Sequence, residues 1–596
     1  MSSRERGGPV PPAGGTGPEG AAASARGASG GAAAGEVAAR GPGTGGAAGG
    51  AAARTFRAHA GVQAEPAPAS PAAGAAASDP RAAPGEAGTA GAGGPGSSRS
   101  QTLELPFVAP ALRQWLSSPK PLFIGGRWQE PRSGRYLTVT DPATGEPLAE
   151  VAEAGEEDVD LAVQAARRAL EGSWGKLPPA ERGRLLWKLA DLVEENAQEF
   201  AQLESLNTGK PVTETTMADV PLAVEHFRYF AGWATKWTGE TLPVSFPGEY
   251  LAYTRREPVG VVGAIVPWNF PLLIASWKLA PALAAGNTVV LKPSELTPLT
   301  ALRLAELVRQ AGFPPGTVNV LPGYGEPAGR ALVEHPGVDK ISFTGSPAVG
   351  RKIMTAAARD FKRVTLELGG KSPNIVFPDA DLDSAVAGAM MGIFFNQGEV
   401  CCAGSRLFVH KEHFDRVVGA IAERAGRLRQ GPGIDPMTQM GPLISRTHME
   451  RVLGYIERGR AEGAELLVGG EPNPEAGPGY FVKPTVFLGR DDMTIAREEI
   501  FGPVLTVLPF ESLDEVVRRA NDTPYGLAAG IWTRDVAKAI KVAHRLKAGT
   551  VWINGYNLLD ATSPWGGFKQ SGIGREMGRY ALEHYTEVKS VWVNLG

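Results

Sequence analysis

The chain has 596 residues with 60 Lys and Arg against 63 Asp and Glu, a formal net charge of −3, and 2 Cys. A charge balance so close to zero, without a basic cluster, argues against a nucleic-acid-binding protein. The adjacent Cys401 and Cys402 cannot make a disulfide framework, and no apolar run is long enough to span a membrane, so we expect a cytoplasmic protein without a membrane partner.

The first 100 residues differ in composition from the rest. They contain 31 Ala, 24 Gly and 11 Pro, with few large side chains. Such a segment cannot bury enough apolar surface to offset its conformational entropy, so we predict a disordered Ala/Gly/Pro-rich tail over residues 1–100. A functional interaction arm is the alternative.

Between residue 101 and about 255 the patterns are mostly helical, including a helix predicted over 181–206. Residues 239–258 are typical of a β-hairpin. From 259 to 370 short β-rich runs alternate with helical patterns. We predict strands at 259–267, 287–293, 317–323, 340–346 and 363–370, and helices at 272–285, 298–312, 326–336 and 348–358.

This alternation indicates right-handed βαβ units and a parallel sheet. Ligands bind such a sheet outside the carboxyl ends of its strands. The segments VPWN, KPSE, FTGS and ELGG all stand at predicted strand ends. The fold class is therefore α/β, with a Rossmann-like parallel-sheet domain over 101–238 and 258–370.

A second α/β pattern begins after residue 371, and we predict a separate catalytic domain over 371–562. Its predicted helices cover 382–395, 413–429, 447–462, 513–522 and 536–546, and its strands cover 405–411, 502–510, 527–533 and 550–555. The chain closes on an exposed-looking strand within 580–596. Unpaired strand edges favour pairing with another chain.

Both cysteines lie in FNQGEVCCAGSRLF, a polar loop between a predicted helix and a strand. A free Cys is most often a small buried side chain. Loop placement favours a reactive thiol instead. The eight histidines have no spacing typical of a zinc site, so we expect no metal.

Six segments resemble the NAD(P)-dependent aldehyde dehydrogenase superfamily: PWNFP, KPSE, VTLELGGKSPNIVF, FNQGEVCCAGSR, EEIFGPV and PWGGFKQSGIGRE. They occur in the order and spacing of that family, from about residue 120 to 596. The resemblance implies a nucleophile at Cys401, which attacks the aldehyde carbon and later leaves as a thiolate. It also implies an oxyanion hole from the Asn269 amide and the Cys401 backbone N–H, and a general base at Glu367 for thioester hydrolysis.

The resemblance also implies NAD as the cofactor. No GxGxxG fingerprint is present, and GSPAVG opens a helix after a strand instead, where backbone N–H groups can hold a pyrophosphate. Glu295 can bind ribose hydroxyls and would repel a 2′-phosphate, which favours NAD and leaves NADP open. The cofactor residues implied are Trp268, Lys292, Glu295, Gly345, Ser346, Gly350, Glu499 and Phe501. The resemblance also places His448 near the adenine, at a position where many members of the family have Gln.

By family position the substrate tunnel is lined by Phe270, Trp277, Leu222, Leu559 and Trp565. An apolar tunnel for aliphatic or aromatic aldehydes is the preferred interpretation. An aromatic box of Phe270, Trp277 and Trp565 for a cationic substrate such as betaine aldehyde, or an aminoaldehyde, is the alternative.

The resemblance implies that the strands within 239–257 and 580–596 pair between subunits, giving a homodimer or homotetramer. Two rival functions stay open. The same Cys401, Asn269 and Glu367 could hydrolyse activated esters without a nicotinamide, or the fold could serve as a non-catalytic NAD-binding protein.

Overall fold

The computed structural model describes residues 100–596, so the predicted tail, apart from Ser100, lies outside the described residues. The first sheet has the strand order β19-β11-β10-β7-β8-β9-β1-β2. Its strands are β1 (Leu122–Ile124), β2 (Arg127–Gln129), β7 (Val261–Ile265), β8 (Thr288–Lys292), β9 (Val318–Val320), β10 (Lys340–Thr344), β11 (Arg363–Glu367) and β19 (Gly572–Ile573). The five strands from β11 to β9 are parallel, which confirms the predicted βαβ sheet.

Helices cover both faces of this sheet, and neighbouring strand residues therefore face different apolar clusters. Val262 and Val289 pack with helices α3 (Pro179–Glu195), α7 (Pro271–Ala285) and α8 (Leu299–Ala311). Val261 and Val290 pack with α2 (Glu156–Glu171), α9 (Arg330–Glu334) and α10 (Pro347–Ala357). Burial on both faces explains the continuous apolar runs of these strands. No helix between residues 100 and 596 combines the length and apolarity needed to cross a bilayer.

The region before residue 255 contains strands that the sequence patterns did not predict. Besides β1 and β2, the strands β3 (Tyr136–Thr140) and β4 (Pro147–Ala152) form an antiparallel pair. The single helix predicted over 181–206 is wrong, because it breaks at Asn196 into α3 and α4 (Ala197–Thr208). The other helices here are α1 (Pro110–Leu116), α5 (Val212–Glu214) and α6 (Val220–Trp233).

The second sheet has the order β14-β15-β16-β13-β12-β17-β18 and is parallel except for β14. Its strands are β12 (Pro373–Val376), β13 (Arg406–His410), β14 (Glu465–Val468), β15 (Thr485–Leu488), β16 (Val504–Phe510), β17 (Ala528–Trp532) and β18 (Thr550–Ile553). Its helices are α11 (Leu382–Phe394), α12 (Phe414–Gly426), α13 (Arg446–Ala461), α14 (Thr494–Arg497), α15 (Leu513–Asn521) and α16 (Val536–Arg545). The predicted second α/β unit is confirmed, whereas the domain boundaries stay a prediction.

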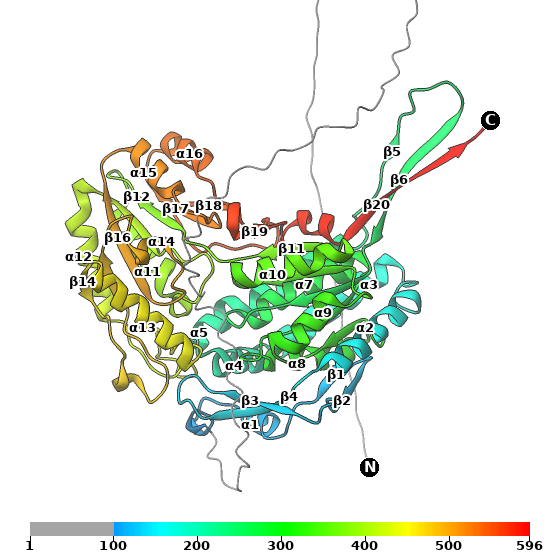
Figure 1. Cartoon of the computed structure of the whole chain (residues 1–596), viewed down its shortest axis with the longest axis horizontal. Coiled ribbons are helices and arrows are strands. Elements are labelled where there is room, and N and C mark those ends of the chain that lie inside the picture. Colours follow the sequence, from blue (N-terminus) through cyan, green and yellow to red (C-terminus); the bar gives the residue numbers. More distant parts are fainter. Residues whose placement is uncertain (1–99) are drawn as a thin grey trace, which may run out of the picture. The chain divides into compact units, whose positions relative to one another are not determined.

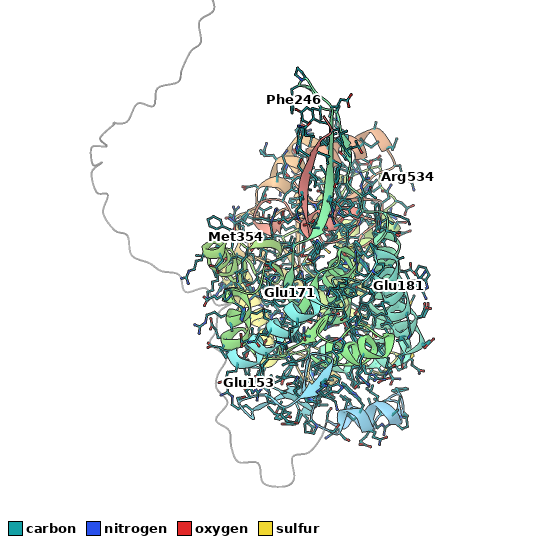
Figure 2. The ribbon with its side chains drawn as sticks, turned by 90° about the vertical axis from the view of Figure 1, so that its right-hand side faces the viewer. Glu153, Glu171, Glu181, Phe246, Met354 and Arg534 are labelled. Atoms are coloured by element: carbon teal, nitrogen blue, oxygen red, sulfur yellow. The ribbon has the colours of Figure 1, made fainter. Side chains whose placement is uncertain are left out.

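Three strands form an arm that extends away from the two larger sheets (Figure 1). The arm has the order β20-β6-β5, with β5 (Thr241–Leu242), β6 (Tyr250–Pro258) and β20 (Thr586–Asn594). The hairpin predicted over 239–258 is therefore confirmed. Phe246 lies near the tip of the arm (Figure 2), where its ring stacks on Trp592 at a centroid distance of 5.8 Å.

Candidate active site

Four of the predicted motifs meet at one edge of the first sheet. Four neighbouring strands of this sheet are parallel: β7, β8, β10 and β11. At their carboxyl ends lie, in the same order, the segments PWN, KPS, TGS and ELGG. Since these ends share an edge, segments separated by up to a hundred residues in sequence line one surface.

The loop that carries Cys401 is joined to the loop that carries Asn269. Asn269 is buried, and its side-chain Nδ2 donates to the Glu399 carbonyl at 2.8 Å. In return, Nδ2 of Asn396 donates to the Asn269 carbonyl at 3.0 Å. A primary amide has two N–H groups, so Asn269 keeps a second one for an oxygen near the thiol. The predicted oxyanion donor is thus held beside the predicted nucleophile.

Glu367, the predicted general base, is the last residue of β11 and is buried. Its Oε1 accepts a hydrogen bond from Nε1 of Trp565 at 3.1 Å, while Oε2 has no partner among the described residues. Burial raises the pKa of Glu367 well above its usual value, and the negative charges of Cys401 and Glu576 raise it further. A raised pKa suits a carboxylate that must accept a proton from water.

The pKa of Cys401 is also raised. The side-chain hydrogen bond with Cys402 is the largest cause, followed by burial and by the charges of Cys402 and Glu499. Cys402 is buried, whereas Cys401 is partly exposed. The thiol therefore holds its proton at rest, a property that the sequence does not encode locally.

A buried ion pair that the sequence analysis missed acts on Glu367. Nζ of Lys278 lies 3.0 Å from Oε1 of Glu576, and both side chains are almost fully buried. The hydroxyl of Ser342 lies within hydrogen-bond distance of both groups. The Lys278 charge lowers the pKa of Glu367, opposing burial and Glu576. Lys278 and Glu576 are 298 positions apart, so no local signal could have paired them.

The loop between β10 and α10 has the form expected of a phosphate-binding turn. Ser346 caps α10, its Oγ accepting from the backbone N–H of Val349. A Cβ on Gly345 would lie 2.5 Å from the Phe343 ring, and one on Gly350 would lie 2.9 Å from Leu368. Both glycines therefore allow close packing of the helix start against the sheet. Pro347 has no N–H and the Val349 N–H donates to Ser346, so the first turn offers a pyrophosphate the N–H of Ala348 at the positive end of the helix.

Lys292 and Glu295 lie at the carboxyl end of β8. Lys292 is buried, its Nζ donates to the Pro293 carbonyl at 3.0 Å and lies 3.9 Å from Glu295. Burial lowers the pKa of Lys292, and the Glu295 charge opposes this effect. The Glu295 side chain is 35% exposed, so its carboxylate is accessible to a ribose.

Glu499, in the loop between α14 and β16, reaches the same edge. Its Oε1 accepts from the Gly370 N–H at 3.1 Å, and a Cβ on Gly369 would lie 2.0 Å from its Oε2. Gly369 and Gly370 are thus functional candidates that the motif ELGG already contained.

Trp268 and Phe501 form an edge-to-face pair at 5.2 Å. His448 packs on Trp268, also at 5.2 Å, and its Nε2 lies 2.7 Å from the Phe501 carbonyl. His448 thus contacts two of the cofactor residues that the resemblance implies, and its expected place near the adenine stays a prediction. Phe501 adopts a φ of +63°, which the sequence did not reveal.

The five predicted tunnel residues and Cys401 belong to or pack on one apolar cluster. Within it the rings of Trp277 and Trp565 lie 6.0 Å apart. The ammonium group of Lys210 already lies over the Phe270 ring, with Nζ 3.8 Å from the ring centroid. The side chains around the predicted tunnel residues are therefore mostly apolar.

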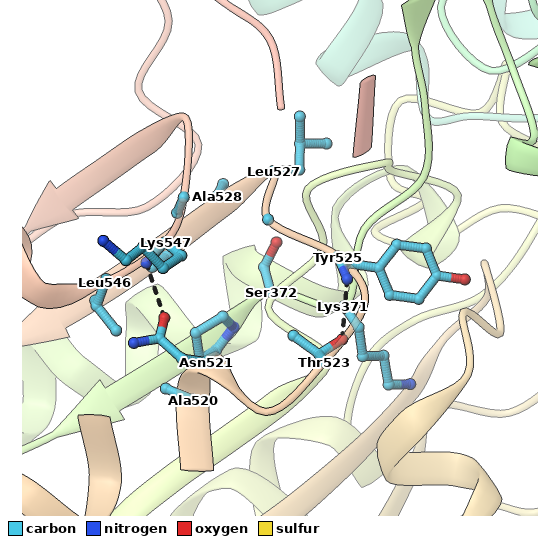
Figure 3. A pocket seen from close by; sticks show the side chains of 14 residues that line it. Lys371, Ser372, Ala520, Asn521, Thr523, Tyr525, Leu527, Ala528, Leu546 and Lys547 are labelled. Atoms are coloured by element: carbon cyan, nitrogen blue, oxygen red, sulfur yellow. Dashed lines mark hydrogen bonds between the residues drawn. The ribbon is translucent and has the colours of Figure 1, made fainter. Parts of the chain in front are cut away.

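A small separate pocket lies near Lys371, Asn521 and Lys547 (Figure 3). Its volume of about 10 Å³ barely admits one water molecule, so it holds neither an aldehyde nor a nucleotide. Across residues 100–596, no three His, Cys, Asp or Glu side chains are grouped to hold a metal.

Comparison with known proteins identifies the family. The model of the "Aldehyde dehydrogenase family" matches residues 128–591. DhaS of Bacillus subtilis (strain 168) is 59% identical over 490 residues, covering 82% of this chain and 98% of DhaS. Retinal dehydrogenase 2 of Homo sapiens is 52% identical over 492 residues, covering 80% of this chain and 94% of that protein.

The solved structures agree with the sequence comparison. The structure of the NAD+ complex of an aldehyde dehydrogenase from Bacillus cereus has a TM-score of 0.81 and 54% identity, covering 82% of this chain and 99% of that one. Because the family model matches most of the chain and the relatives match over nearly their whole length, this chain belongs to the aldehyde dehydrogenase family.

Proposed function

We propose that this chain oxidises an aldehyde to its carboxylic acid with NAD, through a thiohemiacetal and a thioester on Cys401. Family membership makes it an oxidoreductase of the aldehyde dehydrogenase type. The observation that carries the detailed proposal is the joining of the Cys401 and Asn269 loops beside a buried Glu367.

In the first step the Cys401 thiolate attacks the aldehyde carbon and forms a C–S bond. The carbonyl oxygen gains the negative charge, which the free N–H of Asn269 and the backbone N–H of Cys401 stabilise. Removal of the thiol proton is required, because the pKa of Cys401 is raised by the Cys402 contact and by burial. Glu367, whose charge interacts with Cys401, is the candidate base at this edge of the sheet.

NAD, when bound, supplies the acceptor for the hydride that leaves the substrate carbon. The chain's own residues then complete the reaction. Once Glu367 has released the thiol proton to solvent, it takes a proton from a water molecule, whose oxygen attacks the thioester carbon while the C–S bond breaks. Cys401 leaves as a thiolate and the acid is released. The free acid is the expected product because Glu367 is present.

The cofactor residues support NAD. The N-terminus of α10 with Gly345, Ser346 and Gly350 would hold the pyrophosphate, Lys292 and Glu295 the adenosine ribose, and Trp268, Glu499 and Phe501 the nicotinamide end. The exposed Glu295 carboxylate disfavours a 2′-phosphate, so we propose NAD over NADP. The NAD+ complex of the Bacillus cereus relative supports the same choice.

For the substrate we propose an aliphatic or aromatic aldehyde in the tunnel of Phe270, Trp277, Leu222, Leu559 and Trp565. The mutual contact of Trp277 and Trp565 and the Lys210 cation on Phe270 argue against an aromatic box for betaine aldehyde. Betaine aldehyde belongs in the substrate panel as the rival.

We further propose a cytoplasmic homodimer or homotetramer. The arm exposes apolar side chains, among them Phe246 and Trp592, each 52% exposed, and its β20 edge has no strand partner within the described chain. Such an edge suits pairing with a second copy. Light scattering after gel filtration gives the mass, and a monomer at micromolar concentration would contradict this part of the proposal.

The decisive experiment is NAD reduction by the purified protein with an aliphatic, an aromatic and betaine aldehyde. Wild type is compared with Cys401→Ala and, as a matched control, Cys402→Ala. We expect reduction by wild type and by Cys402→Ala and none by Cys401→Ala. A Cys401→Ala variant that still reduces NAD would remove the nucleophile assignment.

The two rivals have their own signatures. Ester hydrolysis that needs no nicotinamide, without aldehyde oxidation, would identify an esterase. NAD binding without turnover of any aldehyde would identify a non-catalytic binding protein.

A further inference from the structure

The loop before Cys401 contains a buried carboxyl group that the proposed mechanism does not use. Glu399 stands two residues before Cys401, and its side chain is 1% exposed. Burial raises the pKa of Glu399 well above its usual value, although the bond from Ile444, the Lys210 charge and Gln397 oppose this. Burial thus favours the neutral carboxyl, which adds no negative charge beside an oxyanion that forms on the substrate.

The backbone carbonyl of Glu399 orients the proposed oxyanion donor. It accepts from Nδ2 of Asn269 at 2.8 Å and from Nδ2 of Asn396 at 3.2 Å. The first bond occupies one N–H of the Asn269 amide, so it fixes the plane of that amide and the direction of its second N–H. A shift of the Glu399 backbone would therefore turn the second N–H away from the carbonyl oxygen of the aldehyde.

The loop depends on contacts with other segments, because its own backbone is strained. Asn396 and Gln397 adopt φ values of +46° and +54°, a region that residues other than glycine rarely occupy. Residues in such conformations persist only when the surrounding structure holds them, and they are common at active sites. The contacts that hold this loop therefore decide where the Glu399 carbonyl lies.

Glu399 supplies one of these contacts with its own side chain. Its Oε1 accepts from the backbone N–H of Ile444 at 2.9 Å, which joins the loop to the segment just before α13. A second acid holds the loop earlier, where the Asn396 N–H donates to Oε2 of Glu214 at 3.0 Å. The Ile444 bond acts on the residue whose carbonyl holds Asn269, so it bears directly on the oxyanion hole.

The neighbouring histidine does not turn this contact into an ion pair. Nε2 of His448 lies 3.7 Å from Oε1 of Glu399 and 2.7 Å from the Phe501 carbonyl. Burial lowers the pKa of His448 to about 4, and the Arg451 charge lowers it further. The imidazole is therefore neutral near neutral pH, and Glu399 acts through hydrogen bonds rather than through charge.

We propose that Glu399 is a positioning residue for the oxyanion hole: its carboxyl group, by accepting from the Ile444 N–H, fixes the backbone carbonyl that orients the Asn269 amide. The inference rests on the proposed function, because it concerns the oxyanion of the same reaction. Glu399 touches no substrate atom and transfers no proton in this role, in contrast to Glu367.

The first test compares two variants of Glu399. Glu399→Leu removes the hydrogen bond, and Glu399→Gln keeps a neutral acceptor of nearly the same shape. We expect Glu399→Leu to lower kcat for aldehyde oxidation about tenfold or more, since loss of a complete oxyanion donor costs about 10²–10³. Glu399→Gln should retain most of the wild-type kcat, and both variants should keep the wild-type Kd for NAD.

Glu462→Leu is the matched control. Glu462 accepts from the Thr494 backbone N–H at 2.7 Å at the other end of α13, so this variant loses the same kind of bond on the same helix. It should keep the wild-type kcat. An equal fall in kcat for Glu462→Leu and Glu399→Leu would overturn the inference, because it would reflect general disturbance of α13.

A second test separates the oxyanion hole from the nucleophile. It uses the Cys402→Ala background, in which Cys401 is the one cysteine left in the chain. Iodoacetamide alkylates a thiolate by displacing iodide and creates no oxyanion, so Glu399→Leu should keep the alkylation rate. Hydrolysis of p-nitrophenyl acetate creates an oxyanion, so its rate should fall together with kcat. Equal losses of alkylation and hydrolysis would overturn the inference.

A double-variant cycle with Asn269→Ala gives the decisive outcome. If Glu399 acts through Asn269, Glu399→Leu should have little further effect on kcat once Asn269 is gone. Independent, multiplying losses would overturn the inference, as would wild-type kcat for Glu399→Leu. A Glu399→Gln variant as slow as Glu399→Leu would also overturn it, because Glu399 would then have to ionise. A wild-type protein that neither oxidises an aldehyde nor hydrolyses the ester would refute the proposed function and the inference with it.

Discussion

The indole N–H of Trp565 donates a hydrogen bond to Oε1 of Glu367 at 3.1 Å. The resemblance places Trp565 in the tunnel wall, and the structure also makes it the hydrogen-bond partner of the proposed general base. A donor stabilises the charged carboxylate, so Trp565 lowers a pKa that burial raises.

Trp565→Phe should therefore raise the pKa of Glu367 further. Because Glu367 acts as a carboxylate, the acid limb of the pH profile of kcat/KM should move to higher pH by about one pH unit. Trp552→Phe is the control: Trp552 contacts Trp565, but its indole N–H donates to the Leu558 carbonyl. If the acid limbs of Trp565→Phe and wild type coincide, the Trp565 hydrogen bond does not affect the pKa of Glu367.

Glu367→Gln should stop acid release and yet stabilise the fold. A carboxyl with a raised folded-state pKa destabilises the folded chain at pH values above its unfolded pKa of about 4.3. The increase in the free energy of unfolding caused by Glu367→Gln should be absent below that pH, grow as the pH rises, and reach about 1–3 kcal/mol. Thermal unfolding of both proteins from about pH 4 to about pH 9 measures this difference in stability. A variant less stable than wild type at about pH 8 would contradict the burial argument.

Gly369→Ala should weaken NAD binding, because the added Cβ would lie 2.0 Å from Oε2 of Glu499. Moving that carboxylate also breaks its bond with the Gly370 N–H. Loss of one hydrogen bond to a charged group predicts a Kd for NAD raised about tenfold or more. Gly454→Ala on α13 is the control, since a Cβ added at Gly454 would meet no atom within 4 Å. Equal affinities of the two variants would refute the steric argument.

Lys210→Met should destabilise the protein strongly. Nζ of Lys210 lies 2.6 Å from Oδ2 of Asp219, with both side chains fully buried, and the Lys210 charge also acts on Glu204 and Glu214. Removing it leaves buried acids without a cation, at a cost of about 3–5 kcal/mol. Denaturation by urea measures this. Lys483→Met breaks the exposed pair with Glu471 and should change little, so similar midpoints for the two variants would count against the prediction.

Much of the fold was predictable from the sequence. The strands and helices from 259 to 370 follow from apolar runs bounded by Gly and Pro, and the motif positions follow from the rule that parallel strands share a carboxyl edge. The strands β1 to β4 escaped prediction because they form antiparallel pairs and do not alternate with helical patterns as β7 to β11 do. The split at Asn196 escaped it because the apolar pattern continues across the break.

The sequence by itself determined the residue types and order of the site: Asn269, Glu367 and Cys401 are each recognisable within a local motif. Only the tertiary structure decided how they are tuned. Trp565 meets Glu367 across 198 positions, and Glu576 meets Lys278 across 298. Proton affinity depends on burial and on neighbouring charges, and both are set by chain segments that meet only when the two sheets pack.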